Sequence, residues 1–150
     1  MRTSPRALLR LHPLHPALAH FPLAFWIGSS VADLLALRSG ATVWWTIAHH
    51  AIAAGDLVAV LALLAGVLEL WLRKLPPEAR KWVGVHASLM GCALLCFLVS
   101  LSWRSVTPPP GAAVAVSFLG SAIVLAGAFC GGTLVYRFGV GVSWRAEGHQ

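Results

Sequence analysis

The side chains with the clearest capacity for chemistry are histidines and acids at the ends of long apolar runs. His12, His15 and His20 fall within HPLHPALAHFP near the start of the chain, and Glu69 and His86 flank a later connection. Neutral imidazole is a common ligand for iron, zinc and copper, and a carboxylate can join it or orient it. These residue types point to a metal or haem site if the fold brings them together.

The runs that carry these groups are long enough to cross a bilayer. Of the 150 residues, 58% are hydrophobic and 11% charged, whereas soluble domains carry about a quarter charged residues. A helix needs about 20 mainly apolar residues to cross ~30 Å of hydrocarbon. Four stretches meet this length: 16–37, 47–72, 82–103 and 112–136. The sequence therefore predicts an all-α membrane protein, a four-transmembrane-helix bundle within residues 1–142, followed by a short polar tail at 143–150.

The positions of Lys and Arg predict the orientation of these helices. Cytoplasmic segments of membrane proteins carry an excess of both residues. Only Arg38 and Arg104 fall on one side of the predicted spans. The remaining basic residues fall on the other side: Arg2, Arg6, Arg10, Arg73, Lys74, Arg80, Lys81, Arg137 and Arg145. We therefore expect a multi-pass protein of the bacterial inner (plasma) membrane with both termini and the middle connection in the cytoplasm.

This topology sorts the polar side chains by depth. His15 and His20 begin the first span, Glu69 ends the second, and His86 lies about one turn into the third. These four groups are expected to share one layer near the cytoplasmic surface. The other polar groups of the spans belong nearer the outer side or mid-depth: Asp33, His49, His50 and Asp56. Asp56 would be a stepping stone for protons or cations if the protein transports ions, and the other three have no assigned role.

Small residues recur at helical spacing in the second and fourth spans. They form one face in each span: Gly55, Ala59, Ala62 and Gly66 in the second, and Gly120, Gly127 and Gly131 in the fourth. Helices in membranes associate through such faces, because lipid is as apolar as leucine and gives no hydrophobic drive for association. We therefore expect close packing at both faces.

Four segments resemble a known family. They are HPLHPALAHFP, Gly66-Val67-Leu68-Glu69, Val85-His86-Ala87 and the C-terminal GGTLVYRFGVGV. Together they are similar to the bacterial membrane family catalogued as domain of unknown function 2231, from about Leu11 to Val142. The resemblance implies a four-helix inner-membrane domain without an established activity. The family tends to have Asp where this chain has Glu69, and it often has Asn where this chain has Met90.

Three functions remain open from the sequence. The first is a scaffold or partner-binding module in the lipid bilayer, in which the polar layer only joins helices and the partner is a second copy or another membrane protein. The second is a redox protein that holds haem b with His20 and His86 as axial ligands. The third is binding or transport of a transition-metal ion through His15, His20, Glu69 and His86. In the structural alternative, His20 bonds a carbonyl freed near Pro22 and His86 pairs with Glu69.

Several other activities are disfavoured. The chain has no G-x-S-x-G, H-E-x-x-H or P-loop motif, so no catalytic residue for hydrolysis is assigned. The basic residues form no stripe interleaved with aromatics, which argues against nucleic-acid binding. Cys92, Cys96 and Cys130 lie inside apolar runs without zinc-type spacing and are expected to pack in the interior.

Overall fold

The structure is a computed structural model that describes residues 14–72, 75–105 and 107–141. Within these residues the chain forms four long helices: α2 (Leu14–Ser39), α3 (Thr42–Leu72), α4 (Pro77–Ser102) and α5 (Gly111–Tyr136). Each helix is long and apolar enough to cross a membrane, so the predicted all-α architecture is confirmed, with four helices as candidate membrane spans. His12 and the predicted tail at 143–150 lie outside the described residues.

Glycine and proline set the ends of the helices. Gly40 adopts a φ of +69° directly after α2, and its N–H bonds the carbonyl of Ala36, as in a common helix C-terminal cap. Pro77 occupies the first turn of α4, where the missing N–H costs nothing. The break before α3 is short, so this helix begins at Thr42, five residues before the predicted span. Hydropathy locates the part of a helix that lies in lipid, whereas the turn residues locate its end.

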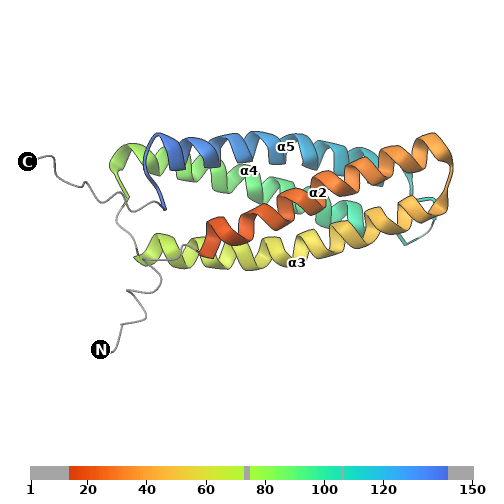
Figure 1. Ribbon diagram of the computed structural model, residues 1–150, viewed down its shortest axis with the longest axis horizontal. Coiled ribbons are helices and arrows are strands. Elements are labelled where there is room, and N and C mark those ends of the chain that lie inside the picture. Colours follow the sequence, from red (N-terminus) through yellow and green to blue (C-terminus); the bar gives the residue numbers. More distant parts are fainter. Residues whose placement is uncertain (1–13, 73–74, 106, 142–150) are drawn as a thin grey trace, which may run out of the picture.

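The four helices form two antiparallel hairpins. Helix α2 packs along α3, and α4 packs along α5, while contacts between the two pairs are far fewer. Figure 1 shows that α2 begins and α5 ends at the same end of the bundle, here called the terminal end. The opposite end, which carries the α2–α3 and α4–α5 connections, is called the loop end. Residues far apart in sequence are therefore brought to common depths.

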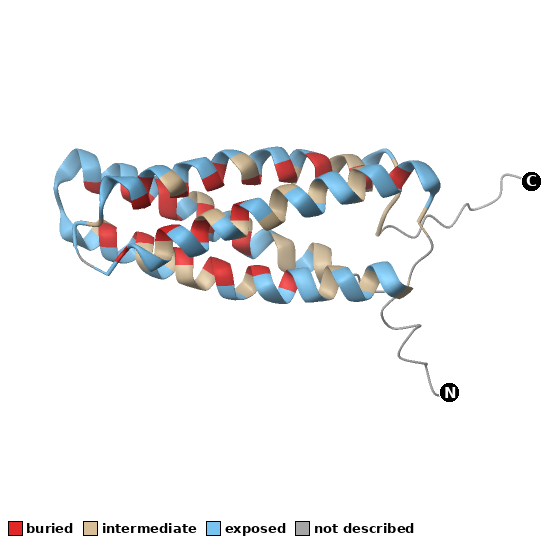
Figure 2. Ribbon diagram, turned by 180° about the vertical axis from the view of Figure 1, so that it is seen from behind, coloured by how far each residue is buried: buried red, intermediate tan, exposed pale blue. Residues whose placement is uncertain are grey.

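The core of the bundle lies where the hairpins meet near mid-length. The rings of Trp26 on α2 and Phe97 on α4 are stacked, with centroids 4.8 Å apart and planes within 5°. Ile52 and Val124 complete this cluster from α3 and α5. Figure 2 shows buried residues on the inward faces and exposed residues over the outer faces. The outer faces carry large apolar side chains such as Leu57 and Phe129, 66% and 74% exposed, as expected of surfaces that contact lipid.

The small-residue faces receive rings from the neighbouring helix, so the predicted close packing is confirmed. A methyl group added at Gly55 would lie 2.7 Å from the indole of Trp26, and one added at Gly120 would lie 2.9 Å from the ring of Phe97. Both distances are shorter than any van der Waals contact. These glycines therefore let aromatic rings lie directly against the backbone of the adjacent helix.

Candidate ligand-binding cavity

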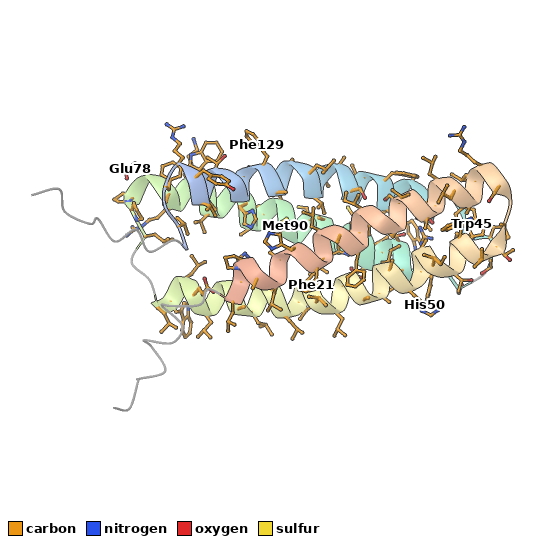
Figure 3. All side chains as sticks on the ribbon, in the orientation of Figure 1. Phe21, Trp45, His50, Glu78, Met90 and Phe129 are labelled. Atoms are coloured by element: carbon orange, nitrogen blue, oxygen red, sulfur yellow. The ribbon has the colours of Figure 1, made fainter. Side chains whose placement is uncertain are left out.

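A cavity of about 200 Å³ separates the two hairpins toward the terminal end. We call it the inter-hairpin cavity. Its walls are mostly apolar and come from all four helices, with Trp26 at its inner end and His15, Glu69 and His86 among its lining residues. Met90, labelled in Figure 3, lines it from α4 between the two hairpins. The cavity thus combines an apolar body with a few polar groups, which is the usual composition of a ligand site.

His15 enters the cavity from the first turn of α2. Its Nδ1 lies 2.7 Å from the carbonyl oxygen of Ala62 on α3. A carbonyl only accepts hydrogen bonds, so Nδ1 carries the proton, and in the neutral ring Nε2 keeps a free lone pair. Gly66 makes room for the ring, since a methyl group there would lie 3.0 Å from Nδ1. The imidazole is therefore held in one tautomer and one orientation.

His86 is held in the same way on the other hairpin. Its Nδ1 lies 2.8 Å from the carbonyl oxygen of Gly127 on α5, and its ring packs against Gly131. The rings of His15 and His86 have centroids 6.2 Å apart and planes at 83°. Each hairpin thus supplies one imidazole, fixed through Nδ1, to the same cavity. The expected pairing of His86 with Glu69 is replaced by the bond to Gly127.

Glu69 has a positioning role at this end of the molecule. Its Oε1 accepts a hydrogen bond of 2.9 Å from the backbone N–H of His15. The first N–H groups of a helix have no partner within the helix, and a carboxylate there also interacts favourably with the helix dipole. Glu69 therefore joins the end of α3 to the start of α2 and fixes the height at which His15 enters the cavity.

His20 lies apart from this group. Its side chain is exposed, its Nδ1 lies 2.7 Å from the carbonyl of Pro16 in its own helix, and it does not line the cavity. Five positions along an α-helix turn a side chain through about 500°, which leaves it about 140° from its starting direction. His15 and His20 therefore cannot face the same cavity. The predicted haem pair requires His20 and His86 to lie close together, and the structure does not bring them together.

The proposed four-residue metal set is likewise not assembled. His15, Glu69 and His86 share the cavity, but His20 is outside it. Among residues 14–72, 75–105 and 107–141, no group of three or more His, Cys, Asp or Glu side chains is placed to hold a metal ion.

On α3, His49 and His50 contact each other edge to face, with centroids 5.4 Å apart. Figure 3 shows His50 on the outer side of that helix.

The loop end contains an ion pair that the sequence analysis missed. Arg104 donates from both terminal nitrogens to the carboxylate of Asp33, with Nη1 2.8 Å from Oδ1. Its Nε donates to Ser100, and Ser117 contacts both charged groups. Arg104 is 6% exposed and Asp33 is fully buried. The signal in the sequence was an acid inside a span, which requires a partner. From the sequence alone, Arg104 counts as a loop charge instead.

A second buried acid lies nearer mid-depth. The indole N–H of Trp26 donates to Oδ1 of Asp56 at 3.0 Å, which links α2 to α3 beneath the cavity. The other oxygen, Oδ2, is buried and has no hydrogen-bond partner among the described residues. Asp56 therefore orients the indole that closes the inner end of the cavity.

One comparison with known proteins identifies the chain. The profile of the family described as predicted membrane protein (DUF2231) matches residues 11–144. The chain belongs to the DUF2231 family. This match covers all four helices and every lining residue of the cavity in this DUF2231 protein. Neither the curated proteins nor the solved structures contain a match to it.

Proposed function

We propose that this DUF2231 protein is a membrane module that binds a ligand within the bilayer, in the inter-hairpin cavity. The polar part of the ligand lies between His15 and His86, and its apolar part lies against the helix faces. One observation carries the proposal: two histidines from different hairpins, each fixed through Nδ1 by a backbone carbonyl, line the same apolar cavity. Side chains held in place with an unused nitrogen are typical of a preorganised site.

This function accounts for the histidines better than a purely structural role does. Polar groups that only join helices bond across the interface they stabilise. The Nδ1 bonds of His15 and His86 do so, from α2 to α3 and from α4 to α5, but among the described residues neither Nε2 has a hydrogen-bond partner. A scaffold or partner-binding role accounts for the Nδ1 bonds but assigns no role to the two Nε2 atoms.

The proposal includes the orientation expected from the sequence, with the terminal end on the cytoplasmic side of the bacterial inner membrane. The packing of Arg104 supports it. This residue is one of two basic side chains on the opposite side, and it is buried against Asp33. Arg38 is therefore the one basic side chain left exposed among the described residues of that side. Reporter fusions to the C-terminus, active only in one compartment, test this orientation directly.

Two glycines of α4 allow the cavity to be filled without disturbing the fold. Gly91 lines the cavity, and no atom lies within 4 Å of a methyl group added there. Gly84, on the same helix, has the same open surroundings but does not line the cavity. Gly91→Leu should therefore occupy the ligand's space, and Gly84→Leu is its matched control.

The test is native mass spectrometry of the full chain released from membranes in polymer nanodiscs. Wild-type protein and Gly84→Leu are expected to carry a bound small molecule, and Gly91→Leu is expected to lose it while keeping its helical content. A wild-type protein without any bound molecule contradicts the proposal. So does a molecule that Gly91→Leu and wild type retain equally.

A further inference from the structure

We infer that the ligand is an iron porphyrin, with His15 and His86 as its two axial ligands. This inference rests on the proposed function and names the class of molecule that the cavity takes. It differs from the haem site expected from the sequence, because His15 rather than His20 lines the cavity together with His86.

The hydrogen bonds of the two imidazoles decide what can lie between them. Both Nδ1 atoms donate to backbone carbonyls, so in the neutral rings both Nε2 atoms are lone-pair donors to whatever fills the gap. Two such nitrogens cannot hydrogen-bond each other. An occupant that satisfies both is therefore a hydrogen-bond donor or a metal ion, and the spacing of the two rings favours the metal ion. Axial histidines commonly have the same second bond, from the remote N–H to a backbone carbonyl.

The spacing of the rings matches coordination of one metal ion from opposite sides. If both Nε2 atoms face the ion, a metal–nitrogen distance of about 2 Å on each side and a nitrogen roughly 1.1 Å from its ring centroid give a centroid separation of about 6.2 Å. The observed separation of the His15 and His86 rings is 6.2 Å. The angle of 83° between the planes is compatible with this, because rotation about a metal–nitrogen bond leaves the bond intact.

The number and charge of the available ligands favour a porphyrin over a free ion. Two neutral imidazoles would leave a divalent cation with its full charge in an apolar cavity, which is strongly unfavourable. Glu69 is already bonded to the N–H of His15, and no third ligand completes a site among the described residues. A porphyrin supplies four equatorial nitrogens and two negative charges of its own. The porphyrin ring itself needs only two axial ligands and apolar walls.

Among the described residues, no side-chain hydrogen bond joins the two hairpins at the end where a porphyrin would enter. At the terminal end the hydrogen bonds of His15 stay within α2–α3, and that of His86 stays within α4–α5. The side-chain bonds between the hairpins lie toward the loop end, where Asp33 and Ser30 bond Arg104, Ser117 and Ser121. The cavity therefore lies at the less constrained end of the bundle.

Iron held by both histidines would keep no open coordination position.

The first measurement is the visible spectrum of the purified full chain, before and after titration with haemin. We expect a Soret band at one porphyrin per chain, and a strongly anisotropic low-spin ferric signal by electron paramagnetic resonance, because the imidazole planes are nearly perpendicular. His15→Ala and His86→Ala should each lose the band. His86→Met, which retains a ligand, should keep the porphyrin with a shifted spectrum. His20→Ala and His50→Ala are matched controls and should be unchanged.

The outcomes separate this inference from the proposed function. Loss of the band in His20→Ala, or its retention in both His15→Ala and His86→Ala, overturns the ligand assignment. A wild-type chain that stays helical yet binds no haemin, or that carries a stoichiometric metal without porphyrin, overturns the porphyrin itself. If native mass spectrometry then still finds a molecule that Gly91→Leu excludes, the ligand-binding function stands and only its ligand class is wrong.

Discussion

At the loop end of the bundle, Asp33 on α2 bonds Arg104 and Ser117 from the other hairpin, whereas at the terminal end His15 and His86 bond only within their own hairpins. Both ends bury polar side chains in an otherwise apolar bundle. At the loop end the carboxylate and the guanidinium satisfy each other. At the terminal end each imidazole retains one nitrogen without a described partner.

This difference indicates a division of roles along the bundle. A buried network with every group paired rigidifies the elements that carry it. The loop end therefore fixes how the two hairpins are placed relative to each other. The terminal end keeps a cavity between them, lined by His15 and His86. Substitutions at the two ends test this division.

Arg104→Met should have the largest effect on stability. It leaves the carboxylate of Asp33 buried without its cation, and breaking a buried ion pair from one side costs about 3–5 kcal/mol. The measurement is thermal unfolding in mild detergent, followed by circular dichroism. The double variant Asp33→Leu with Arg104→Met removes both charges and should recover most of the loss. Equal stability of the single variant and wild type would show that the ion pair does not hold the hairpins together.

Trp26→Phe should have the next largest effect. The substitution keeps an aromatic ring to stack on Phe97 but removes the N–H that bonds Asp56. Asp56 then has two buried oxygens without a partner, and an unsatisfied buried group costs about 1–3 kcal/mol. Asp56→Asn is the companion variant, because its amide oxygen can still accept from the indole. If Trp26→Phe proves no less stable than Asp56→Asn, the hydrogen bond contributes little.

The sequence predicts the number and approximate bounds of the helices well, because hydropathy and helix rise depend only on the order of residues. It places Glu69 and His86 at one depth for the same reason. It does not predict the rotation of a helix about its axis, which is set by packing against neighbours. The exchange of His20 for His15 is such a rotational error. The reach of Arg104 back to Asp33 also depends on packing, because a long side chain at a helix end can turn inward or outward.

Two adjacent glycines on α5 sharpen the comparison at the cavity end. A methyl group at Gly131 would lie 3.1 Å from the ring of His86, whereas nothing lies within 4 Å of one at Gly132. Replacing a helical glycine by alanine stabilises a helix by roughly 0.5–1 kcal/mol where space permits. Gly132→Ala should show this gain in thermal stability. Gly131→Ala should show less or none, and it should also weaken binding of the ligand by moving His86. Equal gains at both positions would mean that Gly131 is not required for the orientation of His86.

His20→Ala should have the smallest effect. Its hydrogen bond joins two residues of the same helix at an exposed position, and substitutions at such sites change stability by about 0.5 kcal/mol or less. His15→Ala removes a half-buried bond between α2 and α3 and should cost about 1 kcal/mol. Thermal unfolding of both variants under identical conditions compares two histidines only five positions apart on one helix. A larger loss for His20→Ala would mean that α2 is rotated in the membrane so that His20 faces inward. The assignment of His15 to the cavity would then be wrong.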